Sequence, residues 1–123
     1  MALRLALITL FGEAAVALTA ALASPPATTG PLLIGTTGPD PVITLKWRGR
    51  KVTRVKPGTY RIRVYDRADS HDFNIRGPRL NKKITGRLFT GAKLVTVTLR
   101  KGRHEYYCEP HWLGGMRHWF TVR

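Results

Sequence analysis

Three side chains that bind soft metal ions lie close together near the end of the chain, in the segment YYCEPHWLGGM at 106–116. Cys108 is the only cysteine, His111 follows it after two residues, and Met116 follows after four more. A thiolate, an imidazole and a thioether in one loop can meet at a single metal ion. Thiolate and thioether suit copper, and two histidines, one cysteine and a weakly bound methionine form a blue-copper site.

The second histidine of such a site must come from elsewhere, and His71 in the segment DSHDF is the leading candidate. Taken singly, each residue has a simpler explanation: a buried cysteine and methionine pack in cores, and a histidine often serves only as a hydrogen-bonding group. The combination predicts a site for one copper ion with the ligands His71, Cys108, His111 and Met116. Zinc would also accept the thiolate and both imidazoles.

The elements that must hold these residues are short strands. Apolar and polar residues alternate with a period of two, between turn signals such as Lys-Pro-Gly at 56–58, and no helical period extends over a useful length. The expected strands cover 42–47, 59–66, 71–75 (with His71 on it), 93–99, 104–108 and 119–122, while 80–91 reads as irregular. The fold class predicted is all-β, a Greek-key β-sandwich.

The first 41 residues differ in composition from the rest. Residues 1–23 combine a weakly basic start, an apolar run from 5 to 22 and a small-x-small cleavage site, which predicts a signal peptide. Residues 24–41 are rich in proline, glycine and threonine and read as a linker or a flexible mature N-terminus, which leaves 42–123 as the domain. Within this segment, the apolar cluster 32–34 is a candidate for a short first strand. The protein is therefore expected to be exported, to the periplasm, the extracellular space or the cell surface, with no membrane span once mature. An uncleaved N-terminal anchor is the alternative.

The charge is strongly positive, with 21 Lys and Arg against 7 Asp and Glu, for a net +14. Such a field attracts anionic partners. Two readings of the cations on outward strand positions stay open: a solvated basic face, or a docking surface for an acidic redox partner. The residues concerned are Arg61, Arg63, Arg76, Arg79, Lys82 and Lys83. Binding of nucleic acid is not expected, because aromatic and basic residues do not interleave along any one strand.

The segments around His71 and from Cys108 to Met116, together with Pro57-Gly58-Thr59-Tyr60, resemble the cupredoxin family, and the loop spacing is similar to that of plastocyanin and pseudoazurin. The resemblance covers roughly 42–123. It implies that His71, Cys108 and His111 are equatorial ligands, that Met116 is the long axial ligand, and that the outer edge of His111 is the electron port, rimmed by Pro110, Trp112 and Leu113.

Two departures from that family pattern stand out. Asp72 replaces the usual asparagine and would face Glu109. Because two carboxylates there would repel, either one of them is neutralised or Arg76 or Arg117 lies nearby. The bulky residues 117–119 replace smaller ones after the methionine. The roles of His104 and His118 stay open, and hydrogen-bonded or solvated histidines are expected.

These observations predict a monomeric electron carrier, not an enzyme, because four histidines leave too few ligands for further copper sites. The partner expected is a redox protein with an acidic docking surface. The alternative is an exported copper chaperone or storage protein that uses the same ligands.

Overall fold

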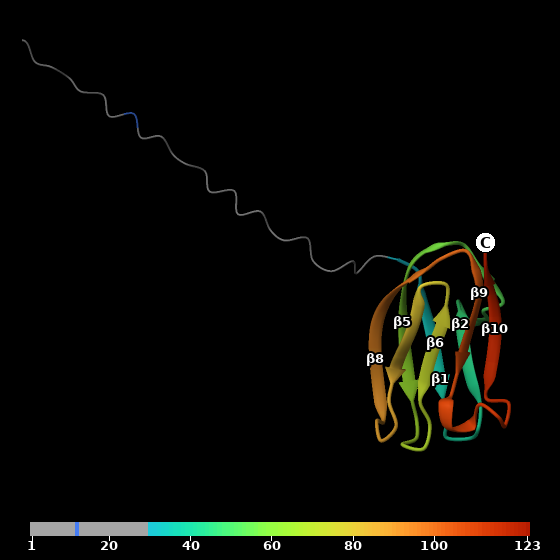
Figure 1. The fold of residues 1–123 in the computed structure, drawn as a ribbon. Helices are drawn as coiled ribbons and strands as arrows, with labels where there is room; N and C mark the ends of the chain where they lie inside the picture. Colours follow the sequence, from blue (N-terminus) through green and yellow to red (C-terminus); the bar gives the residue numbers. More distant parts are fainter. Residues whose placement is uncertain (1–11, 13–29) are drawn as a thin grey trace, which may run out of the picture.

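A computed structural model describes residue 12 and residues 30–123 (Figure 1). The predicted signal peptide at 1–23 and most of the predicted linker lie outside these residues. The part of the chain described contains almost only strands, which run in the order β1 Leu32–Thr37, β2 Ile43–Trp47, β3 Arg50–Lys51, β4 Arg54–Val55, β5 Gly58–Asp66, β6 Phe73–Gly77, β7 Leu80–Thr85, β8 Gly91–Leu99, β9 Gly102–Tyr107 and β10 Arg117–Val122. One short 3₁₀ helix, η1, covers Glu109–His111.

The strands form two five-stranded sheets that pack face to face, so the predicted β-sandwich is confirmed. One sheet has the order β3-β2-β1-β5-β8 and the other β4-β10-β9-β6-β7. Most neighbours are antiparallel, but β1 runs parallel to β5, and β4 runs parallel to β10. The core lies between the sheets because inward residues alternate with outward ones, as in β5, where Tyr60, Ile62 and Val64 are buried.

The predicted boundary of the linker is wrong at its C-terminal side, because residues 32–37 form β1. This strand lies in the interior of its sheet, between β2 and β5. Its composition misled the prediction: Gly35 faces inward, where a Cβ atom would lie 2.8 Å from the Phe73 ring. A glycine that makes room for an aromatic ring has the same sequence signature as a flexible linker.

The expectation of irregular structure at 80–91 is also wrong in its first half. Residues 80–85 form β7, which pairs with β6 at the edge of its sheet. Only Ile84 and Thr85 are buried in this strand, since an edge strand exposes much of its surface. Such a strand needs few apolar residues, so no alternation of apolar and polar residues shows in its sequence.

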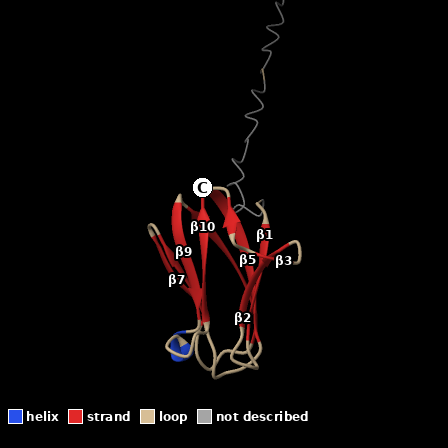
Figure 2. Ribbon diagram, turned by 90° about the vertical axis from the view of Figure 1, so that its right-hand side faces the viewer, coloured by secondary structure: helices blue, strands red, loops and turns tan. Residues whose placement is uncertain are grey.

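All four loops that carry or border the predicted ligands lie at one end of the sandwich, at the bottom in Figure 2. They join β1 to β2, β5 to β6, β7 to β8 and β9 to β10, and we call this the site end. The opposite end holds the turns at 48–49, 56–57, 78–79 and 100–101, together with Gly30 and the C-terminus. Among the described residues, no helix is long and apolar enough to cross a membrane.

Candidate metal centre

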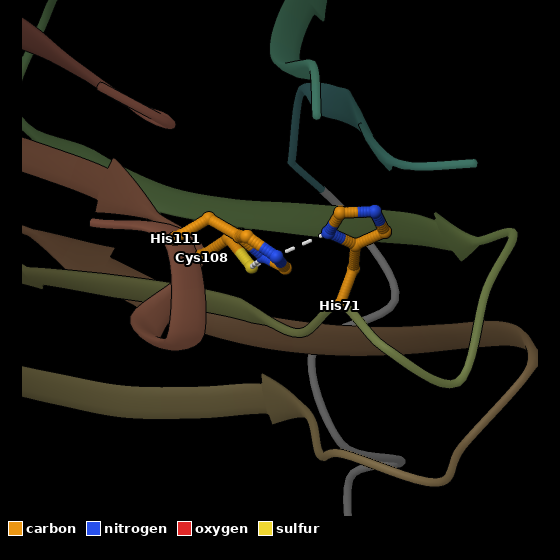
Figure 3. A group of neighbouring side chains, drawn as sticks. All are labelled: His71, Cys108 and His111. Carbon is orange, nitrogen blue, oxygen red and sulfur yellow. Dashed lines mark hydrogen bonds between the residues drawn. The ribbon is translucent and has the colours of Figure 1, made fainter. Parts of the chain in front are cut away.

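Three of the four predicted ligands meet at the site end (Figure 3). Sγ of Cys108 lies 3.6 Å from Nδ1 of His71 and 3.5 Å from Nδ1 of His111. The candidate ligand atoms of these residues all lie within 4.8 Å of one another. Both rings direct the same nitrogen toward the sulfur, so two imidazole lone pairs and one sulfur can be directed at a common point.

His71 was expected to lie on a strand, but it lies in the loop that precedes β6, which begins at Phe73. It is nevertheless buried, and its Nε2 donates a hydrogen bond to the carbonyl of Pro39 over 3.0 Å. This bond places the ring proton on Nε2 and leaves the lone pair on Nδ1, which faces the sulfur. The ring also packs on Gly38, where a Cβ would come within 2.7 Å and where φ is +71°, so a glycine is required there on both counts.

Cys108 is fully buried at the end of β9. Burial raises the pKa of its thiol, against an opposing hydrogen bond from the backbone of Asp72. The metal-free thiol is therefore protonated at neutral pH, and a metal that binds there must displace its proton.

Met116 is brought back to the cysteine by a tight loop. The backbone N–H of Cys108 donates to the carbonyl of Met116 over 3.0 Å, and the N–H of Met116 donates to the carbonyl of His111 over 3.2 Å. Gly115 has φ of +92°, which permits the turn just before the methionine. The Met116 side chain is buried. Its place in the loop keeps it a candidate ligand, and this role stays a prediction.

The expected encounter of Asp72 with Glu109 is present, but the cation that neutralises the pair is Lys83, not Arg76 or Arg117. Nζ of Lys83 lies 2.8 Å from Oδ2 of Asp72 and 3.0 Å from Oε2 of Glu109. Lys83 comes from β7, the strand that the sequence did not predict. The two carboxylates raise the pKa of Lys83 against the opposing effect of burial, which is the largest single influence.

Arg76 and Arg117 have other partners. Arg76 pairs with the fully buried Glu105 over 2.6 Å, and Nε1 of Trp112 donates to the same carboxylate over 3.3 Å. Arg117 lies over the Trp112 ring, 3.9 Å from its centroid. Glu105 thus anchors the loop after His111 to the sheet. Sequence reasoning missed this residue, because nothing in the sequence distinguishes it from a surface glutamate on a strand.

The outer edge of His111 is partly exposed and lines a surface hollow of about 600 Å³. Pro110 borders this hollow, as expected of the rim, and Leu88 from the β7–β8 loop does so too. Leu113, which is 93% exposed, and Trp112, which is partly buried, line a separate hollow. Leu88, at 86% exposed, was not predicted.

The remaining histidines lie outside this cluster. His104 is fully buried, stacks on Phe120 and shares a hydrogen bond of 3.2 Å with the carbonyl of Gly102. His118 accepts a hydrogen bond from Lys51 over 3.3 Å and packs on Tyr106. Both are hydrogen-bonded histidines, as expected, and His104 is not solvated.

Five of the six cations named above as one basic face are divided between the two sheets, and Arg79 lies in the turn between β6 and β7. Arg61 and Arg63 lie on β5, whereas Arg76, Lys82 and Lys83 lie on β6 and β7 of the other sheet. The interpretation as a single face is therefore wrong, because adjacent segments of sequence cross from one sheet to the other.

The fold and the His-Cys-His cluster together define a cupredoxin-like β-sandwich with a candidate metal centre. Among solved structures, the chain is similar to the copper protein rusticyanin, with a TM-score of 0.58, 16% identity, and coverage of 77% of this chain and 80% of that one. A structure of rusticyanin from Thiobacillus ferrooxidans matches with a TM-score of 0.54 and 19% sequence identity, over 77% of this chain and 79% of that one. Auracyanin from Roseiflexus castenholzii matches with a TM-score of 0.46 and 18% sequence identity, over 77% of this chain and 98% of that one. No family model and no curated protein matches the sequence. The likeness to rusticyanin, at these identities, establishes the fold alone.

Proposed function

We propose that this protein is a mononuclear copper protein that carries single electrons between partners. The observation that carries the proposal is the convergence of one thiol and two Nδ1 atoms within 4.8 Å in a loop cluster held by two sheets. Rusticyanin, which shares the fold, is a copper protein. Bound copper would supply one-electron chemistry between two oxidation states.

Each proposed ligand has a separate role. Cys108, His71 and His111 would hold the copper ion, and Met116 would be a fourth, weaker ligand. The hydrogen bond from His71 to the Pro39 carbonyl fixes the tautomer, and the hydrogen bond that Asp72 accepts from the N–H of Glu109 fixes the cysteine loop. A frame that is held by buried hydrogen bonds moves little when the charge at its centre changes, which suits electron transfer.

The electron would enter and leave at the outer edge of His111. This edge is the part of the cluster that reaches the surface, beside Pro110 and Leu88, whereas Cys108 and His71 are buried. An apolar rim lets a partner protein approach without displacing tightly held water. We propose a transient redox protein as the partner, a monomeric carrier without catalytic activity, and an exported location that follows from the sequence of residues 1–23.

A chaperone or storage protein would use the same ligands but release the metal readily. The fully buried Cys108 and the hydrogen bonds behind His71 favour retention instead. Slow loss of copper to a mild chelator is therefore expected.

The test is visible absorption of the purified protein after addition of copper(II), beside a Cys108→Ala variant. An intense thiolate-to-copper band, absent from the variant, together with reversible one-electron reduction, supports the carrier. A protein that binds copper without this band, or loses it within seconds to the chelator, contradicts the proposal.

A further inference from the structure

Much of the net positive charge of the described residues lies at the end opposite the site, where no carboxylate balances it. The turns and strand termini at that end carry exposed cations and, among the described residues, no aspartate or glutamate. We call this set the basic end: Arg48, Arg50, Arg54, Lys56, Arg79, Arg100, Lys101, Arg103 and Arg123.

The carboxylates are distributed in the opposite way. The exposed ones in the described chain are Asp40, Asp69 and Glu109, and all three lie in loops of the site end. The others are buried, and two of them, Asp72 and Glu105, are paired with cations. The domain is therefore polarised along its long axis: exposed carboxylates accompany the exposed cations of the site end, such as Arg67 and Arg87, whereas the basic end has exposed cations alone. Such a field orients the molecule toward an anionic surface.

The basic end also exposes aromatic and apolar surface. A hollow of about 640 Å³ lies there, lined by Trp47, Tyr60 and Pro57 with Arg54, Lys56 and Arg123 around it. Trp47 is 41% exposed, and the Arg48 guanidinium lies 4.9 Å from its ring. Exposed tryptophan beside clustered cations is the composition of a membrane-interface contact, since indole rings settle at headgroup level and cations attract anionic lipids.

The N-terminal segment joins the domain at this same end. Pro31 lines the hollow, and its carbonyl accepts the N–H of Arg61. In the sequence, the apolar run 5–22 is separated from Gly30 by residues 23–29 alone, which reach at most about 25 Å. If the apolar run is retained in a membrane, the basic end faces the bilayer. If the run is cleaved off, only the charge of the basic end remains to orient the domain.

From these observations we propose that the basic end docks on the surface of an anionic phospholipid bilayer, so that the site end and His111 point away from it. The proposal does not depend on copper, and metal-free protein tests it. A nucleic acid or an acidic protein offers negative charge as well, but neither accounts for the aromatic hollow or for the chain entering beside it.

The first test compares binding of the full chain to vesicles of phosphatidylcholine alone and of phosphatidylcholine mixed with phosphatidylglycerol. We expect binding to the anionic vesicles to be stronger and to weaken with salt, because it depends on charge. The variant Arg48→Glu/Arg54→Glu/Lys101→Glu should bind them about tenfold or more weakly. The matched control Arg67→Glu/Arg87→Glu/Lys93→Glu has the same net charge, with its changes away from the basic end, and should retain most of the binding.

A second measurement reports orientation even if the apolar run alone holds the protein on vesicles. Of the three tryptophans, Trp112 lies at the site end and Trp47 at the basic end. Brominated lipids should quench the fluorescence of Trp112→Phe/Trp119→Phe, which retains Trp47, and not that of Trp47→Phe/Trp119→Phe, which retains Trp112.

Three results would overturn the proposal. Equal loss of binding in the two triple variants would assign it to total charge, and quenching of Trp112 instead of Trp47 would reverse the orientation. A DNA duplex that binds as tightly as the vesicles, and loses binding in the same variant, would make the basic end a general polyanion surface.

Discussion

The carboxylate of Asp72 accepts a hydrogen bond from the backbone N–H of Glu109 over 2.8 Å, which links the residue after His71 to the residue after Cys108. The same oxygen accepts a bond from the Asn74 amide, also over 2.8 Å, and the other oxygen pairs with Lys83. Asp72 is fully buried. One carboxylate therefore holds both ligand-bearing segments in a common frame and connects them to β7.

Replacing this carboxylate should destabilise the fold. Asp72→Ala leaves the N–H of Glu109 without its acceptor and removes one of the two partners of Lys83 and of Asn74, which keep Glu109 and the Tyr107 carbonyl. We expect a loss of about 3 kcal/mol in the free energy of unfolding. Asp72→Asn keeps the acceptor oxygen and should lose less. Urea denaturation measures both. The control is Asp69→Ala, an exposed carboxylate in the same loop, which should change stability by less than about 0.5 kcal/mol. Equal losses in Asp72→Ala and the control would contradict this role.

Metal binding should stabilise the protein through the candidate ligands. Zinc suits this test because it accepts the same thiolate and imidazoles without oxidising the thiol. At a free concentration of about 100 times its dissociation constant, it should raise Tm by about 10 °C or more. The rise should disappear in Cys108→Ser and His111→Ala and persist in His118→Gln, whose ring lies outside the cluster. Persistence of the full rise in Cys108→Ser would exclude the thiol as a ligand.

Stability should fall on mild acidification because of His104. Burial lowers its pKa below the ordinary value of 6.5, with a smaller opposing effect from its hydrogen bond to Gly102. In this pH range the unfolded chain binds the proton more readily than the folded one. The stabilisation is therefore complete above about pH 6.5 and is lost as the pH falls toward the folded-state pKa. The pKa of His118 is lowered too, by burial and then by Lys51, and acts in the same direction.

Urea denaturation at several pH values between about 5 and 8 measures this slope, to which one histidine adds at most about 1.4 kcal/mol per pH unit. His104→Phe keeps a ring against Phe120 and should flatten the slope, and adding His118→Gln should flatten it further. An unchanged slope in His104→Phe would assign acid sensitivity to other groups.

Gly77 should not tolerate a side chain. A Cβ at this position would overlap the ring of the buried His104, which lies directly against the glycine. Gly77→Ala should therefore cost about 1–3 kcal/mol of unfolding free energy through overpacking. In the matched control Gly86→Ala, the new Cβ would come no closer than 4.0 Å to Lys83, so a change below about 0.5 kcal/mol is expected. Thermal or urea unfolding measures the loss in both variants, and an equal loss in Gly77→Ala and Gly86→Ala would contradict the overpacking.

The sequence alone determined the fold class and the main features of the site. Period-two alternation is a local property, so it located β2, β5, β6, β8, β9 and β10 to within about two residues. The spacing from Cys108 to His111 and Met116 is also local, and ligand chemistry could be read from it directly. His71 was proposed because the loop needs a second histidine from elsewhere, the family resemblance supported this choice, and the structure brings its ring to the sulfur.

Only the tertiary structure decided which distant residues support that site. The full extent of β1 was not predicted, because Gly35, which makes room for the Phe73 ring, is typical of a linker in sequence. β7 was not predicted because it is an edge strand that is mostly exposed. Lys83, Glu105 and Pro39 reach the cluster through sheet register and loop packing, and the polarised charge arises because alternate turns lie at opposite ends of the sandwich. These pairings depend on which strands become neighbours, and that is set by burial of the whole core, not by the order of residues along any one segment.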